Sequence, residues 1–257
     1  MELDALALSQ ITSPALTKDE SALLRCQLAA KMAMSSQYEA AREALGELWQ
    51  GVGVRPRLEG LSEKTQAEIL LRAGAISGWL GSAGQIEGAQ ERAKNLISES
   101  ARIFEDLGET EKIAEAHIDL AICYWREGAL DEARITLQQV LIGLEHSQSE
   151  QKLRALLNSA VIEASSDRHY KALEICYQAA PLLEVTSNSA LKGKVHHEFA
   201  LVLKNLGVSQ KREDYIDQAL VEYTAAAYHY EQAGDVRSCA AVESRRANSA
   251  SSARTSS

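Results

Sequence analysis

The chain has few of the aromatic residues that favour β-strands. Only 5% of its 257 residues are aromatic and only three are proline, while alanine, leucine, glutamate and glutamine dominate every periodic segment. Because strands favour β-branched and aromatic side chains, we predict no sheet. The abundant residues have high helix propensity and therefore favour an all-α fold.

Cysteines and long apolar runs are also scarce. The four cysteines, Cys26, Cys123, Cys176 and Cys239, are far apart and form no CxxC pair. We expect them to be small buried side chains in a reducing compartment, not disulfides or metal ligands. The first residues, MELDALALSQ, are acidic where a secretory signal is basic, and no run of about eighteen apolar residues occurs. These absences predict a cytoplasmic protein that does not bind a membrane.

The chain has fewer basic than acidic residues, and it has few patterns typical of catalytic sites. A formal net charge of −9 repels a phosphate backbone, and the one basic cluster is Arg245, Arg246 and Arg254, so we expect no nucleic-acid partner. His196 and His197 are adjacent and point to different sides of a helix, which excludes a same-face metal pair. We therefore expect no enzymatic activity, no cofactor and no metal.

What the chain does contain is a regular spacing of small and large residues in AHIDLAICYWREGALDEARITLQQV, residues 116–140. Two sets of residues three to four apart flank Gly128: Leu120, Ala121 and Tyr124 before it, and Ala133, Leu137 and Val140 after it. Residues at this spacing share one face of a helix. The segment therefore predicts two antiparallel helices that approach most closely at the two alanines, Ala121 and Ala133.

The same spacing recurs along the chain. The matched small residues are Ala29 and Ala41, Ala160 and Ala172, and Ala200 and Ala219. The last two are nineteen residues apart where the others are twelve, and the charged VSQKREDY between them predicts an extra loop or longer helix ends. Another pair is expected between residues 64 and 107, its second helix registered on Ala89 or Ala93. Tyr223 and Tyr230, seven residues apart, are predicted core residues.

This arrangement resembles the tetratricopeptide repeat (TPR) family. The family unit has about 34 residues. Here Ala121 and Ala160 are 39 residues apart and Ala160 and Ala200 are 40 apart, a period that HEAT or armadillo arrays also use. The resemblance implies an α-solenoid, a right-handed superhelix of antiparallel helix pairs. We expect this domain to cover residues 1–242, with about five pairs and the start of a sixth. Residues 243–257, rich in serine and arginine, are predicted to be a disordered tail. The alternative is an array whose continuation has been lost from the chain.

The resemblance also implies a binding surface, because in such arrays the first helices of successive pairs line a concave groove. Carried onto this sequence, the groove residues are Ile118, Ile122, Trp125 and Arg126, then Leu157 and Val161, then His197, Leu201 and Lys204. We expect a groove for an extended or helical peptide, with Trp125 as an anchor and Arg126 or Lys204 meeting acidic side chains. The alternative is that neighbouring helices bury the same apolar residues.

The function implied by this surface is that of a noncatalytic protein-interaction scaffold. The lysine and asparagine residues with which co-chaperone members of the family hold a partner's carboxylate are missing. Segments such as ARIFEDLGETEKIAEAHIDLA look like those of bacterial repeat proteins in signalling and transcriptional regulators, which implies a regulatory role. The alternative is a ligand-sensing domain that encloses a small molecule or signalling peptide. The oligomeric state is left open.

Overall fold

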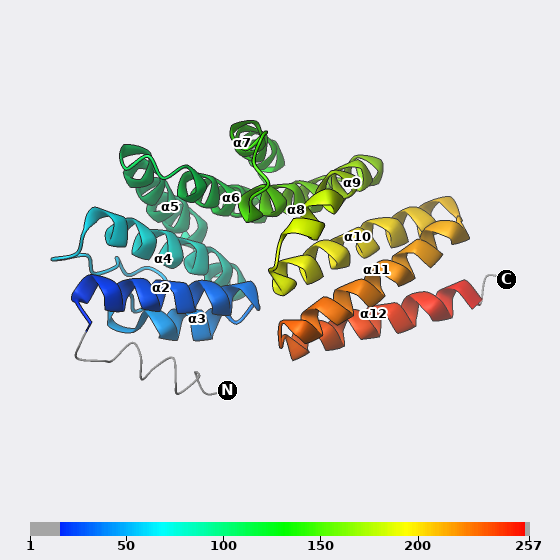
Figure 1. The fold of residues 1–257 in the computed structure, drawn as a ribbon, viewed down its shortest axis with the longest axis horizontal. Coiled ribbons are helices and arrows are strands. Elements are labelled where there is room, and N and C mark those ends of the chain that lie inside the picture. The colour runs from blue at the N-terminus through cyan, green and yellow to red at the C-terminus, as the bar shows by residue number, and fades with distance from the viewer. Residues whose placement is uncertain (1–15, 255–257) are drawn as a thin grey trace. The chain divides into compact units, whose positions relative to one another are not determined.

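The predicted all-helical fold is confirmed. The computed structural model describes residues 16–254, which form eleven α-helices and one short 3-10 helix, with no strand among them (Figure 1). The elements are α2 (Lys18–Met34), α3 (Tyr38–Leu45), η1 (Gly46–Leu48), α4 (Glu63–Ala83), α5 (Ala89–Asp106), α6 (Thr110–Glu127), α7 (Leu130–Gly143), α8 (Glu150–Ser165), α9 (His169–Val185), α10 (Ser189–Gln210), α11 (Glu213–Gln232) and α12 (Val236–Arg254).

The helices form two compact units that divide within α7, between Thr136 and Leu137. The first unit holds α2 to α6, and the second holds α8 to α12. Each unit has its own buried interior. The expected single repeat domain over residues 1–242 stays a prediction.

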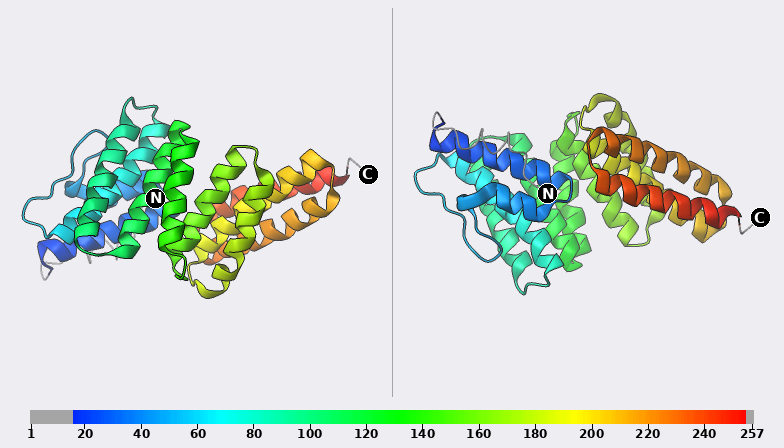
Figure 2. Two further views of the ribbon diagram at one scale, coloured as in Figure 1. Left: turned by 90° about the horizontal axis from the view of Figure 1, so that it is seen from above. Right: turned by 90° about the horizontal axis from the view of Figure 1, so that it is seen from below.

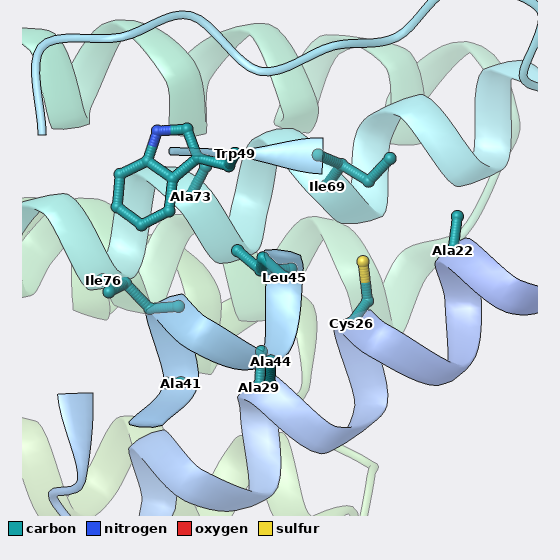
Figure 3. Packing of buried hydrophobic residues seen from close by; sticks show 10 residues of the cluster. All are labelled: Ala22, Cys26, Ala29, Ala41, Ala44, Leu45, Trp49, Ile69, Ala73 and Ile76. Carbon is teal, nitrogen blue, oxygen red and sulfur yellow. The ribbon is translucent and has the colours of Figure 1, made fainter. Parts of the chain in front are cut away.

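The first unit is built on the hairpin of α2 and α3, which packs against α4. Its small residues, Ala29 and Ala41, are fully buried, as predicted. Figure 3 shows Leu45 and Trp49 beside Ile69, Ala73 and Ile76 of α4. Burying a large apolar side chain contributes roughly 1.5–3 kcal/mol, so this cluster ties the hairpin to the next pair.

Glycines on α4 let α5 approach closely. A Cβ at Gly81 would lie 2.2 Å from the Cβ of Ala89, and one at Gly74 would lie 3.0 Å from the carbonyl oxygen of Ala93. Both alanines are buried, so both of the proposed register positions face α4. Two helices flank Gly128, as predicted, since α6 ends at Glu127 and α7 begins at Leu130, and Ala121 and Ala133 are fully buried.

The second unit contains the longest hairpin, α10 with α11. The extra residues predicted here extend both helices, because only Lys211 and Arg212 separate the end of α10 from the start of α11. Lys211 adopts a left-handed conformation with φ of 54° at this turn. Tyr223 and Tyr230 are buried, which confirms both as core residues, and the Tyr230 ring lies directly over Gly193.

Helix α12 covers a segment that we predicted to be disordered. It packs along α11 and continues through the serine- and arginine-rich residues to Arg254 (Figure 2). The prediction is therefore wrong for residues 243–254, while residues 255–257 lie outside the described residues. The physical reason is burial at helical spacing: Val242 is fully buried and Ser249 is 2% exposed, seven residues apart on one face.

Two further expectations concern proline and cysteine. The sequence pattern places the three prolines, Pro14, Pro56 and Pro181, at helix ends or between helix pairs, but Pro181 lies inside α9, and Pro14 falls outside the described residues. Cys239 is free but only partly buried, whereas Cys26, Cys123 and Cys176 are free and buried, as expected. Burial raises the pKa of each of these three thiols to about 12.

Candidate partner-binding face

Helices α4 and α6 of the first unit carry two matching rows of mainly polar and aromatic residues, of which Glu68, Arg72, Glu115 and Asp119 are buried and the others are partly exposed. The residues are spaced three or four apart on each helix, so that each set shares one helical face. We call them the α4–α6 face: Glu68, Arg72, Ala75, Trp79 and Ser82 from α4, and Glu115, Asp119, Ile122 and Arg126 from α6.

At one end of this face, three side chains stack on one another. The guanidinium carbon of Arg126 lies 3.8 Å from the centre of the Trp79 ring. Tyr38, at the start of α3, stacks on Trp79 with ring centres 4.8 Å apart and planes 9° apart. Arg126 Nε also donates a hydrogen bond to Ser82 Oγ over 3.0 Å. Together with Ile122, the three stacked residues form what we call the aromatic–arginine patch, and all four are partly exposed.

The charge at the patch is unpaired. Among residues 16–254, Arg126 makes no ion pair with a carboxylate. Burial lowers its pKa from the ordinary value of 12.5, but arginine stays charged at neutral pH. Burial raises the pKa of Tyr38 to about 12, so its phenol is neutral. The patch therefore combines apolar surface with one partly desolvated positive charge.

A narrow pit lies within the patch. Its volume is about 10 Å³, and it is lined by residues that include Ala75, Gly78, Trp79 and Ile122. A space of roughly 10–15 Å³ holds about one water molecule. The pit is therefore matched to a small group such as a methyl, and it excludes a whole ligand.

At the other end of the face, a network of buried charges joins α4 to α6. Arg72 Nη2 lies 2.5 Å from Glu115 and 3.6 Å from Glu68, and Lys112 Nζ lies 2.5 Å from Glu68 and 3.1 Å from Glu115. Burial lowers the pKa of Arg72, but Glu115 and Glu68 outweigh it and raise the pKa. Removing one partner of a buried pair costs roughly 3–5 kcal/mol, because the other charge is left unpaired. The network therefore fixes the register of the two helices that carry the patch.

One of the predicted groove residues does not reach the surface. Ile118 is fully buried, so the prediction that it contacts a partner is wrong. It lies one helical turn before Ile122 on α6, and neighbouring residues cover it completely. Ile122 and Arg126 do come together in the patch, and Trp125, also partly exposed, lies outside it.

The other predicted residues belong to the second unit. Leu157 and Val161 on α8, and His197, Leu201 and Lys204 on α10, are all partly exposed. The His197 ring lies 6.1 Å from that of Tyr223 and 6.3 Å from that of Tyr230. Burial lowers the pKa of His197 to about 4, which makes this side chain a neutral packing group at pH 7.

The sequence interpretation missed Tyr38, Trp79 and the charged network. The available signal was the spacing of residues 68, 72, 75, 79 and 82, which repeats that of 115, 119, 122 and 126. Within the part of the chain that the structure describes, no three His, Cys, Asp or Glu residues are grouped to hold a metal ion. The same residues include no helix with the length and apolar character of a membrane span.

Comparison with known proteins identifies the fold. No family model and no curated protein matches the sequence. Aspartyl phosphate phosphatase F from Bacillus subtilis superposes with a TM-score of 0.56 and 13% identity over 93% of this chain and 57% of that one. Kinesin light chain TPR-like repeats from Podosopora anserina give 0.52 and 16% over 80% and 97%. A Rap protein complexed with Competence and Sporulation Factor gives 0.50 and 14% over 93% and 66%.

These likenesses define a fold and leave the activity open. The chain spans 57% of the length of the phosphatase and 66% of the Rap protein, at identities of 13% and 14%. The TPR-like repeats match over nearly their whole length, and the matched alanine spacing agrees with them. The chain therefore has a TPR-like helical repeat fold.

Proposed function

We propose that this chain is a noncatalytic, regulatory protein-interaction module that binds a peptide or helix of a partner on the α4–α6 face. The single observation that carries the proposal is the aromatic–arginine patch. It places a partly desolvated cation without a carboxylate partner next to partly exposed aromatic and aliphatic side chains. Tryptophan, tyrosine and arginine are the residue types that dominate binding energy at protein interfaces.

The chemistry of the patch selects the partner's side chains. An acidic side chain that pairs with Arg126 would gain a charge-assisted hydrogen bond, and the contact with Trp79 already holds the guanidinium over the ring. A neighbouring aliphatic side chain would cover Ile122 and the pit. The solved Rap protein in the comparison is complexed with Competence and Sporulation Factor, which supports a regulatory partner for the same fold.

The second unit offers its own set of contact residues. We propose Leu157 and Val161 of α8, with Leu201 and Lys204 of α10, as this set, because all are partly exposed at the positions where the family binds. His197 contributes the edge of a largely buried ring.

Three free, buried thiols are consistent with a reducing compartment, and we propose a cytoplasmic location.

The test is selection of random linear peptides on the full chain, followed by affinity measurement. We expect enriched peptides to carry Asp or Glu next to an aliphatic residue. Arg126→Glu should weaken their binding at least tenfold, which corresponds to about 1.4 kcal/mol. Arg102→Glu is the matched control, because it makes the same charge change at an exposed position of α5.

The outcome of the two charge reversals decides the proposal. Equal loss with both variants would show a general effect of charge, and no loss with Arg126→Glu would remove the patch from the binding site. Circular dichroism of each variant establishes that the helices are intact. Arg126→Gln, which removes the charge without reversing it, should give the same direction of change.

A further inference from the structure

A second hollow of the first unit shares no residue with the α4–α6 face. It lies where the beginning of α2 meets η1 and the loop after it, and its volume is about 660 Å³. Pockets for small molecules are typically about 300–1,000 Å³. The apolar part of its wall includes Leu16, Leu48 and Leu61, so the hollow has room and surface for a short aliphatic chain.

The charges around this hollow are separated from one another. Lys18, Arg25 and Arg57 line it together with Glu47 and Glu59. Among the described residues 16–254, none of these five makes an ion pair. Three cations and two carboxylates leave one net positive charge, in a chain whose formal net charge is −9. A locally positive hollow on an acidic protein favours a ligand with one negative charge.

Arg25 is the cation that the fold holds in place. Its Nη1 donates a hydrogen bond to the carbonyl oxygen of Ala44 over 3.3 Å. Gly46, with φ of 57°, makes room for it, because a Cβ there would lie 2.6 Å from the same nitrogen. Arg25 is partly buried, and within the described part of the chain its Nε and Nη2 have no hydrogen-bond partner. These two nitrogens form the edge of a guanidinium that binds a carboxylate with two parallel hydrogen bonds.

We propose that this hollow binds a small amphipathic monocarboxylate. The carboxylate pairs with the Nε and Nη2 edge of Arg25, Lys18 and Arg57 add attraction at longer range, and the aliphatic chain covers Leu48 and Leu61. Glu47 and Glu59 set the limit on ligand charge, because a dianion such as phosphate exceeds the single net positive charge of the wall. The site is independent of the partner-binding face and holds whether or not that face binds a peptide.

Octanoate is the probe for this site, and octanol and inorganic phosphate are its controls. Amide chemical shifts of the full chain are followed by NMR during each titration. We expect saturable shifts for octanoate, confined to the segment between Leu16 and Leu61, and at least tenfold weaker binding of octanol and phosphate. Equal binding of octanol would show a purely apolar site, and equal binding of phosphate would show a general anion site. Either result overturns the proposal.

Variants assign the carboxylate to Arg25. Arg25→Gln should weaken octanoate binding at least tenfold, and Lys18→Gln, at an exposed position, about threefold. Arg102→Gln on α5 is the matched control and should bind as the unaltered chain does. Undiminished binding to Arg25→Gln overturns the proposal. If Arg25→Gln unfolds α2, the proposal is still tested by the octanoate titration of Lys18→Gln and by the location of the chemical-shift changes in the unaltered chain.

Discussion

Arg126 on α6 lies over the Trp79 ring of α4, with 3.8 Å between the guanidinium carbon and the ring centre. Tyr38 of α3 stacks on the same tryptophan, so one side chain joins three helices of the first unit. Trp79 is therefore both part of the proposed binding surface and a structural contact between helix pairs.

The stacking of Arg126 on Trp79 should appear as an energetic coupling. We expect Arg126→Gln and Trp79→Leu, combined in a double-mutant cycle, to give an interaction energy of about 0.5–2 kcal/mol. Urea unfolding followed by the fluorescence of Trp49 and Trp125 measures it in all four proteins. Effects that add within about 0.3 kcal/mol would show that the stack contributes nothing to stability.

The close packing of α4 on α5 should make any larger residue at position 81 destabilising. Gly81→Ala would gain up to about 1 kcal/mol of helix propensity, but its Cβ would lie 2.2 Å from that of Ala89. We expect net destabilisation of about 1–3 kcal/mol, since overpacking forces the helices apart. Gly143→Ala is the control, because no atom lies within 4 Å of a Cβ at that position. It should be neutral or stabilising, and similar losses at both glycines would contradict the packing argument.

Two adjacent residues of α10 should give opposite pH dependences of stability. Burial raises the pKa of Glu198 from 4.5 to about 7, so the folded state binds more protons than the unfolded state between those values. Its contribution to the free energy of unfolding falls as pH rises through that range. Burial lowers the pKa of His197 from 6.5 to about 4, so the contribution of His197 rises between pH 4 and 6.5.

These opposing contributions nearly cancel in the unaltered chain and separate in variants. Relative to it, Glu198→Gln should gain stability as pH rises from 4.5 to about 7, and His197→Gln should lose stability as pH rises from about 4 to 6.5. Urea unfolding at several pH values, followed by circular dichroism, gives both slopes. Slopes of the same sign in the two variants would show that one of the two environments is misassigned.

Docking of α12 should protect its arginines from trypsin. Val242 is fully buried, so Val242→Asp places a charge in the contact with α11 and should release the helix. We expect cleavage after Arg245 and Arg246 to accelerate at least tenfold. Val236→Asp is the control, because Val236 is 78% exposed and lies at the start of the helix, where an acid is favourable. Rapid cleavage of the unaltered chain would restore the interpretation of a disordered tail.

The helix pairs could be predicted from the sequence because close contact between two helices requires a small residue at the point of contact. Ala29, Ala41, Ala121 and Ala133 are fully buried, and a small side chain at such a position lets two helices pack closely. In contrast, α12 escaped prediction because its interior contacts are small. Val242 and Ser249 are enough to dock a helix on an existing surface, although composition alone favours disorder.

The candidate site could be predicted only in part. Ile122 and Arg126 were found because the family places partner contacts on this helix. Tyr38 and Trp79 were not, because their stacking joins residues of different pairs. The repeated spacing on α4 and α6 marks Trp79 as part of a shared face, but it does not show which side chain of α3 packs there. Ile118 was misassigned for a related reason: it lies one helical turn from Ile122, and the spacing within α6 does not show that neighbouring residues bury it completely.

The three sequestered thiols give each unit its own reporter of opening. Cys26 and Cys123 belong to the first unit and Cys176 to the second, and at a pKa of about 12 almost none of each is thiolate at neutral pH. Only the thiolate attacks an alkylating reagent, so each of these three cysteines reacts only in molecules whose surrounding helices have separated. Pulse labelling and mass spectrometry would thus time the unfolding of either half in one sample, without an added dye or an engineered residue.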